Sequence, residues 1–289
     1  MPVPGRGVVA LLVVVGAWGL VWPVNKVLLE SFSPYWLSAI RSAIATVAMF
    51  VIVTATGRLR RPTRADMPVV VSIALLHMAG FVVLGNIGLA LVTTGRAVVL
   101  AYTTPLWVTP AAAIVLGERL TVRRVLGVVI GLLGLAVLFN PLAFDWSDRR
   151  AVLGNLAILA AALLWAANIV HLRAHDWRAT PFELTPWEML LATAVLVPVA
   201  LATGPMPTVE WTPRVILLLG YSAVVGTALA YWAMATAGRL LPAMTTALGL
   251  LATPVVSIAV ATLWLGEPVT ASLLAAVVLV LGGIALGTR

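Results

Sequence analysis

The chain has 289 residues, of which 62% are hydrophobic and 10% are charged, and its formal net charge is +8. Soluble domains are about 45–50% apolar and roughly 25% charged, so this composition argues against a soluble enzyme or a disordered chain. The 18 basic residues are spread along the chain rather than clustered, which argues against a nucleic-acid partner. The absence of cysteine excludes disulfides and thiol chemistry.

Ten stretches are long and apolar enough to cross a bilayer as helices, because a hydrocarbon core about 30 Å thick needs roughly 20 residues. The connectors between them are short and carry the proline and glycine breakers. The first stretch is long and has no cleavage site after it, so we expect a retained helix rather than a signal peptide. The predicted spans are 7–29, 35–56, 68–92, 97–116, 122–139, 152–171, 184–203, 214–237, 242–265 and 270–287.

The placement of the basic residues predicts the orientation. If the N-terminus is cytoplasmic, twelve of the 18 fall in cytoplasmic segments, four in outer segments and two inside spans. Because Lys and Arg gather in cytoplasmic loops, both termini are expected in the cytoplasm. Only one of the 18 is lysine, and Ala, Val, Leu and Gly are abundant. This bias indicates a GC-rich genome, so we expect a multi-pass protein of a bacterial inner (plasma) membrane.

Two motifs recur 149 residues apart. Thr104-Pro105 is followed by Gly117-Glu118, and Thr253-Pro254 is followed by Gly266-Glu267 at the same spacing. Each half, 1–145 and 146–289, contains five spans, and an odd number turns the second half upside down relative to the first. The sequence therefore predicts an all-α integral membrane protein with ten transmembrane helices in two inverted five-helix repeats, the architecture of many secondary transporters.

These motifs resemble the EamA-type unit of the drug/metabolite transporter superfamily. The resemblance runs from Gly95 through Tyr102-Thr103-Thr104-Pro105 to Gly117-Glu118, includes Trp18 and Arg41, and is repeated by Trp165-Ala166 and Gly266-Glu267. It covers nearly the whole chain as two EamA-like repeats. It implies ten helices in an inverted five-plus-five arrangement and the export of small metabolites. The superfamily includes YddG-like amino-acid exporters, nucleotide-sugar transporters and drug transporters.

Tryptophan and asparagine share one helical face in the first and the sixth span. Trp18, Trp22 and Asn25 are spaced four and three apart, and Trp165 and Asn168 are three apart. An amide that faces lipid would lose its hydrogen bonds, so these residues are expected either to line a cavity or to bind a neighbouring helix.

The third span carries His77 and Asn86, nine residues apart. A straight α-helix points such a pair in opposite directions, so at most one is expected to face a cavity unless Gly80, Gly85 or Gly88 bends the helix. The alternative for His77 is a hydrogen bond to another helix.

Two prolines and four side chains with hydroxyl groups complete the candidate site. Pro105 and Pro254 interrupt the backbone ladder near the middle of the membrane, so both are candidate helix kinks. The predicted substrate-binding residues are Trp18, Trp22, Asn25, His77, Asn86, Tyr102, Thr104, Trp165, Asn168, Thr227 and Tyr231. Polar-tipped aromatic residues suit a largely apolar ligand of amino-acid size with one polar end.

Charged residues within the spans are few. Lys26 and Arg41 lie toward the outer side, where snorkelling, a Lys26–Glu30 helical pair and attraction of a substrate carboxylate are the alternatives. Every Asp and Glu is expected in a connector or near a span end. His77 is then the only mid-span group that can titrate near neutral pH, so we expect facilitated transport with, at most, weak proton coupling through His77.

Catalytic and metal sites have little support in the sequence. His171, His175 and Asp176 are spaced as metal ligands could be, but no further ligand is evident, so neither a metal nor another cofactor is expected. We therefore expect a secondary transporter, not an enzyme, that exports neutral or aromatic amino acids by alternating access. Drug or cation efflux is the alternative transport function, and an integral membrane enzyme is the alternative class. The expected partners are a small-molecule substrate and the bilayer, with either a monomer or a dimer.

Overall fold

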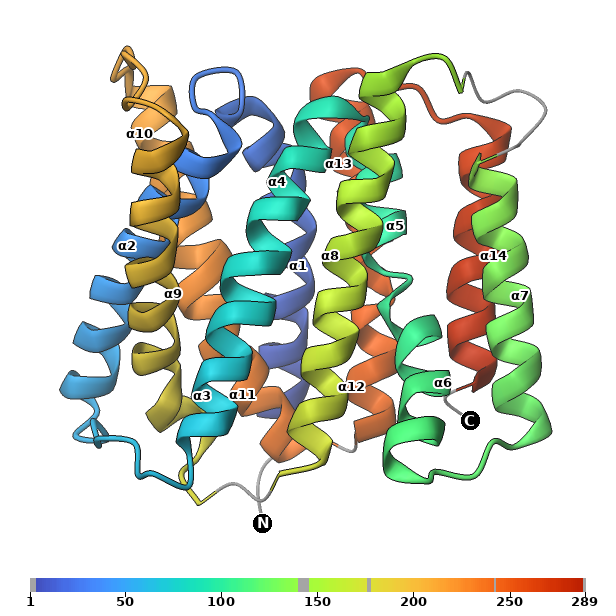
Figure 1. Ribbon diagram of the computed structural model, residues 1–289, viewed down its shortest axis with the longest axis horizontal. Coiled ribbons are helices and arrows are strands. Elements are labelled where there is room, and N and C mark those ends of the chain that lie inside the picture. The colour runs from blue at the N-terminus through green and yellow to red at the C-terminus, as the bar shows by residue number, and fades with distance from the viewer. Residues whose placement is uncertain (1–3, 140–145, 176–177, 242, 288–289) are drawn as a thin grey trace.

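The computed structural model describes residues 4–139, 146–175, 178–241 and 243–287. Among these residues every regular element is helical and there is no strand. The elements join into ten rods, of which nine are long and apolar enough to span a membrane and the last is a shorter apolar helix, in a multi-pass membrane fold (Figure 1). In chain order the rods are α1 (Pro4–Leu28), α2 (Pro34–Ala55), α3–η1–α4 (Met67–Ser72, Ile73–Phe81, Val82–Leu91), α5–α6 (Thr94–Ala101, Thr104–Leu116), α7 (Val122–Phe139), α8 (Arg149–Arg173), α9 (Pro181–Thr203), α10–η2–α11 (Pro213–Gly220, Tyr221–Leu229, Ala230–Leu240), α12–α13 (Ala243–Leu250, Ala252–Leu265) and α14 (Ala271–Gly287).

The helix ends follow from local sequence. Ser33 and Thr212 accept hydrogen bonds from the first-turn amides of α2 and α10, each directly before a proline at the first helical position. Thr180 and Glu183 form a capping box at the start of α9. At the C-terminal ends of α6 and α13, Gly117 and Gly266 have φ of 67° and 68°, a left-handed conformation that favours glycine.

The two repeats match in an unusual detail of the backbone. The third rod contains a π-helical segment, η1, and the eighth rod contains another, η2, which begins 148 residues later and has the same length of nine residues. In η2 the Thr227 hydroxyl donates to the carbonyl of Ser222, five residues earlier (2.9 Å). Wide turns of this kind often occur at functional sites.

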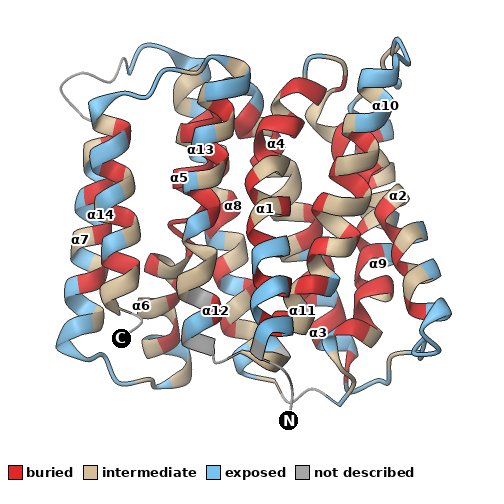
Figure 2. Cartoon of the chain, turned by 180° about the vertical axis from the view of Figure 1, so that it is seen from behind, coloured by how far each residue is buried: buried red, intermediate tan, exposed pale blue. Residues whose placement is uncertain are grey.

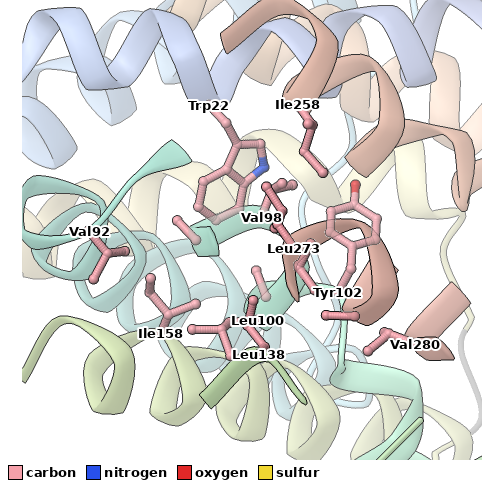
Figure 3. Packing of buried hydrophobic residues seen from close by; sticks show 14 of the residues in the cluster. Trp22, Val92, Val98, Leu100, Tyr102, Leu138, Ile158, Ile258, Leu273 and Val280 are labelled. Carbon is pink, nitrogen blue, oxygen red and sulfur yellow. The ribbon is translucent and has the colours of Figure 1, made fainter. Parts of the chain in front are cut away.

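Both chain termini lie at the same end of the bundle, as an even number of spans requires (Figure 1). We call this the termini end and the opposite one the far end. Buried residues concentrate in the rods at the centre, while α7 and α14 lie side by side at one edge with much of their surface exposed (Figure 2). The first half of the fourth rod, α5, is central to one core cluster, in which Val98 and Leu100 pack near Trp22, Ile258 and Leu273 (Figure 3).

The glycines of α7 bring it against α14. A Cβ atom added at Gly127 would come within 2.5 Å of the Gly283 carbonyl oxygen, and one added at Gly134 within 2.8 Å of Leu279. These glycines therefore pack the last helices of the two repeats backbone to backbone, as small residues do in membranes. Gly282, in contrast, has open space where its Cβ would lie.

Replacing Gly127 with leucine is expected to lower the melting temperature of the purified protein. The new side chain has no room beside Gly283, and overpacking of this kind costs about 1–3 kcal/mol or more. Thermal denaturation in detergent measures the effect. Gly282→Leu is the matched control and should melt like the parent, so equal destabilisation by both substitutions would contradict this packing.

Candidate substrate-binding cavity

A central cavity lies between the two repeats. It leaves about 80 Å³ for the centres of water-sized spheres. The cavity is therefore larger than the space that a single water molecule requires. The residues that line this central cavity are Trp18, Val21, Trp22, Asn25, Arg41, His77, Phe81, Val82, Gly85, Asn86, Tyr102, Trp165, Gly226, Thr227 and Tyr231. They come from α1, α2, η1, α4, the α5–α6 junction, α8, η2 and α11.

Aromatic rings form much of the wall. Trp165 stacks on the His77 ring with centroids 5.0 Å apart, and its centroid is 5.1 Å from Phe81. Trp18 meets Tyr231 edge to face at 5.9 Å. The Tyr231 hydroxyl lies 3.3 Å from Nε2 of His77, within hydrogen-bonding distance. Such a wall offers flat apolar faces with a few polar tips, which suits an aromatic or aliphatic group on a ligand.

One side of the cavity carries a hydrogen-bonded polar chain across four helices. The Ser222 hydroxyl donates to Oδ1 of Asn25 (2.6 Å), Nδ2 of Asn25 donates to Oδ1 of Asn86 (3.3 Å), and Nδ2 of Asn86 donates to the Ser38 hydroxyl (2.9 Å). Arg41 reaches the same Ser222 hydroxyl at 3.5 Å. Asn25 therefore does both things proposed for it, because it lines the cavity and binds neighbouring helices.

His77 and Asn86 both face the cavity, which the sequence allowed only if the rod departed from a straight α-helix. The cause is the π-helical segment η1, which contains His77. Its wide turns rotate the chain less per residue than an α-helix does, so nine residues no longer separate opposite faces. The counterpart segment η2 places Gly226 and Thr227 in the wall, with Tyr231 one turn later.

Two predicted site residues lie outside the cavity wall. The Thr104 hydroxyl donates to the carbonyl of Ala101 (2.8 Å) and approaches that of Ala162 (3.3 Å), so it joins the start of α6 to α8. Asn168 accepts a hydrogen bond from the Ser72 hydroxyl (3.0 Å) and joins α8 to α3. Helical spacing identified their faces but not the neighbours that those faces meet.

Arg41 does not snorkel. It is only 8% exposed and it lines the cavity. Among the described residues, no acidic side chain comes within 4.0 Å of it. Lys26 is also held inside the protein: its Nζ donates to the carbonyls of Leu89 and Val92 at 2.7 Å each, at the end of α4. The burial of Arg41 could not be predicted from the sequence, because it depends on how the helices pack in the folded chain.

The carboxylates are not all near span ends. Glu188 is the eighth residue of the 23-residue α9 and is 2% exposed. The prediction that placed every Asp and Glu in a connector or at a span end is wrong for this residue.

The fourth and ninth rods are interrupted at matching points. Tyr102 and Thr103 separate α5 from α6, Leu251 separates α12 from α13, and each proline follows three residues after its break begins. Pro105 and Pro254 are thus second or third residues of new helices rather than kinks in continuous ones. Tyr102, at the first break, lines the cavity.

Pro105→Ala and Pro254→Ala are expected to impair transport more than expression. Each proline prevents its two half-helices from fusing into one continuous rod, and the break at Tyr102 borders the cavity. The measurement compares substrate flux in proteoliposomes with the amount of monodisperse protein recovered. Two fully active variants would show that the repeated Thr-Pro is only a packing feature.

Some residues of the cavity wall were not predicted from the sequence. Phe81 follows His77 by four residues, a spacing that was available as a signal. Gly226 had no such signal: a Cβ there would come within 2.4 Å of Val21, so its glycine allows α1 to approach. Among the described residues there is no group of three His, Cys, Asp or Glu side chains that could hold a metal, and Asp176 lies outside those residues.

Comparison with known proteins agrees with this architecture. The model of the EamA-like transporter family matches residues 5–140 and again residues 152–289. The chain belongs to the EamA-like transporter family. As a member it is a transporter, not an enzyme, built from two inverted five-helix repeats.

Several relatives match nearly the full chain. A probable amino-acid metabolite efflux pump of Escherichia coli (strain K12) is 29% identical over 96% of this chain and 93% of its own length. A probable terminal-alkyne amino-acid exporter of Streptantibioticus cattleyicolor is 29% identical over 91% and 86%. The uncharacterized transporter YoaV of Bacillus subtilis (strain 168) is 24% identical over 94% and 92%. A crystal structure at 21% identity superposes with a TM-score of 0.65 over 96% of this chain and 94% of that one, and supports the fold.

Proposed function

We propose that this EamA-like transporter exports small amphipathic metabolites, neutral aromatic amino acids foremost, across a bacterial inner membrane by alternating access. The observation that carries the proposal is the buried Arg41, which lines an aromatic cavity and has no acidic partner within 4.0 Å among the described residues. A guanidinium pairs with a carboxylate through two parallel hydrogen bonds.

The rest of the wall fits the remainder of an amino acid. The ring of the substrate would lie against Trp165 and Phe81, and its ammonium group would find amide oxygens and the faces of Trp18 and Trp22. Two relatives are named as a probable amino-acid metabolite efflux pump and a probable amino-acid exporter, which supports the same class of substrate.

Cation efflux is less well supported by the cavity. Desolvating a cation inside a membrane calls for a carboxylate beside it. The central cavity is lined by one arginine and by no Asp or Glu. A drug-like cation would therefore meet a positive charge without a compensating negative one.

The deciding experiment is flux in proteoliposomes that contain only this protein. Vesicles loaded with unlabelled L-phenylalanine should accumulate radiolabelled L-phenylalanine by counterflow, and L-tryptophan and L-leucine should compete. Tetraphenylphosphonium, a lipophilic cation, should compete poorly. Strong competition by the cation without competition by amino acids would contradict the proposal.

The proposed orientation has its own test. With both termini in the cytoplasm, cysteines introduced at Arg61 and Arg123 should be protected from an impermeant thiol reagent in intact cells, while cysteines at Ser147 and Pro268 should react. The native chain has no cysteine, so there is no background. Strong labelling at position 123 would reverse the orientation.

A further inference from the structure

Glu188 is the most unusual charged group outside the cavity wall. It is 2% exposed, and its Oε1 has no hydrogen-bond partner among the described residues. Burying an ionised carboxylate in such surroundings costs much free energy, whereas burying the protonated acid costs far less. A structural role would be served better by glutamine or by a paired acid, so this carboxyl group is available to take up and release a proton.

Its position mirrors that of Arg41. Arg41 is the eighth residue of α2 and Glu188 the eighth residue of α9, and both helices begin with proline. α2 and α9 pack against each other. Seven residues of helix rise about 10 Å, so the two opposite charges lie at equal depth from opposite ends of the bundle.

Tyr231 links Glu188 to the cavity. Its ring lines the cavity, α11 packs against α9, and Tyr231 lies against the core cluster that contains Met189, the neighbour of Glu188 in the chain. The elements packed against α9 contribute these titratable or charged groups: Tyr35 and Arg41 from α2, Asp66 at the start of α3, His77 from η1 and Tyr231 from α11. Glu188 is the one buried acid inside the membrane-spanning part of this group.

We propose that Glu188 binds the proton that is exchanged for substrate during export. The proposal rests on the proposed function in one respect: the substrate is a zwitterion whose carboxylate is neutralised at Arg41. The ammonium group then adds positive charge beside Tyr231, which favours the ionised form of Glu188. The proton leaves to the cytoplasmic side, the substrate leaves to the outer side, and a proton from outside restores the neutral acid.

A chemical test of the proton site needs no substrate. Dicyclohexylcarbodiimide reacts with protonated carboxyl groups in apolar surroundings. It should modify Glu188 in the purified protein, less so as the pH rises, while the exposed Glu210 stays unmodified. Peptide mapping by mass spectrometry reads out both residues. Absence of labelling at Glu188 at every pH would overturn the proposal.

A transport test addresses coupling. Wild-type proteoliposomes with equal L-phenylalanine on both sides should accumulate it when a pH gradient is imposed. Glu188→Gln should abolish this accumulation but keep counterflow, whereas the control Glu210→Gln should retain both. Labelling of Glu188 without any phenylalanine flux would refute the proposed substrate and leave the proton site standing. Undiminished proton-driven accumulation in Glu188→Gln would refute the coupling role.

A different observation concerns how the ends of the bundle close. At the far end Glu267, just after α13, accepts hydrogen bonds from the amides of Thr94 and Gly95 (2.8 and 3.2 Å) at the start of α5. Lys26 binds the last carbonyls of α4. Together they hold both sides of the α4–α5 junction, each charge matched to the dipole of the helix end that it touches.

The equivalent residues at the termini end pair differently. Glu118 precedes Glu267 by 149 residues, and Arg173 follows Trp165 by eight residues, as Lys26 follows Trp18, yet Glu118 and Arg173 bind each other at 2.9 Å. The local backbone does not explain this: the amides of Glu118 and Glu267 both bond to the carbonyl six residues earlier, at 3.4 and 3.3 Å.

Packing shows the same asymmetry. α5 packs against α13 and α14, whereas its counterpart α12 makes no comparable packing with α6 or α7 among the described residues. Among the described residues, the fourth rod therefore packs more tightly against the other repeat at the far end than the ninth rod does at the termini end.

We infer that Lys26 with Glu267 and Arg173 with Glu118 are matched clamps that close opposite ends in turn. In the alternate state Glu118 would bind the first amides of α12 and Arg173 the last carbonyls of α11, while Lys26 and Glu267 would pair with each other. The inverted repeat requires each end to have both states available.

Cysteine labelling in sided vesicles tests the clamps without any substrate. Thr227→Cys places a thiol in the cavity. An impermeant reagent on the far side should label it poorly in the parent and at least several-fold faster when Glu267→Gln or Lys26→Gln is added. The matched changes at the termini end, Glu118→Gln and Arg173→Gln, should give no increase. No acceleration by either far-end variant, or equal acceleration by all four, would overturn the inference.

Discussion

Replacing Arg41 with glutamine is expected to lower kcat/KM for L-phenylalanine by about 10- to 100-fold. Hydrogen bonds to charged groups contribute about 1.5–3 kcal/mol, and each 1.4 kcal/mol corresponds to a factor of about ten. Among the described residues, the guanidinium makes a single hydrogen bond, to the Ser222 hydroxyl at 3.5 Å, so most of its donors are available to a ligand. Initial rates of counterflow over a range of substrate concentrations measure the loss.

A pair of ligands distinguishes a lost anchor from a damaged cavity. 2-Phenylethylamine has the ring and the amine of phenylalanine but no carboxylate. Arg41→Gln should weaken inhibition of transport by phenylalanine and leave inhibition by phenylethylamine unchanged or stronger. Arg41→Lys should fall between, because lysine keeps the charge but not the planar fork. Equal weakening for both ligands would show that Arg41 supports the fold of the cavity rather than the substrate.

The spans and their pairing into repeats were readable from the sequence because they depend on quantities that are local in the chain. Run length and apolarity decide what can cross a bilayer. The Gly-Glu and Thr-Pro pairs mark equivalent points, and an odd number of spans per repeat forces the inversion. The structure places the ends of α6 and α13 at Gly117 and Gly266 with nearly identical φ, as a true repeat should.

The site was harder to predict because it depends on which faces meet. Helical spacing put Trp165 and Asn168 on one face, but only Trp165 reaches the cavity, since Asn168 meets Ser72 first. Residues nine apart point in opposite directions only in a straight α-helix. That argument did not hold for His77 and Asn86, because no simple sequence pattern marks a π-helical segment. Arg41 and Glu188 differ from snorkelling or span-end charges only through tertiary burial, which a one-dimensional pattern does not contain.

The structure also offers a second candidate for a proton-binding group. With His77 as the only mid-membrane titratable group, facilitated transport was the natural expectation. His77 is committed to the aromatic wall, stacked on Trp165 and within hydrogen-bonding distance of Tyr231. Glu188, which has an unpartnered oxygen, is the better candidate for a group whose charge changes during the cycle.

Replacing Trp165 with alanine is expected to lower kcat/KM for aromatic substrates by about 10- to 100-fold. The indole contacts the His77 and Phe81 rings and also lies 6.2 Å from the Tyr102 ring, so it is the centre of the aromatic wall. Burying an aromatic side chain is worth about 1.5–3 kcal/mol. A substrate ring that loses its main flat partner should lose much of that free energy, and initial rates in proteoliposomes measure it.

The decisive quantity is the ratio between two substrates rather than either rate alone. L-Valine has no ring to stack, so Trp165→Ala should reduce its transport much less than that of L-phenylalanine, and the preference for phenylalanine should fall. Trp165→Phe should restore most of the preference because it restores a flat face. Trp264→Ala removes a tryptophan that is 41% exposed on α13 and outside the cavity wall, so it should leave the ratio unchanged. If Trp165→Ala lowers both rates by the same factor, the indole supports the helices around the cavity, and recognition of the ring must lie with Trp18, Trp22 or Phe81.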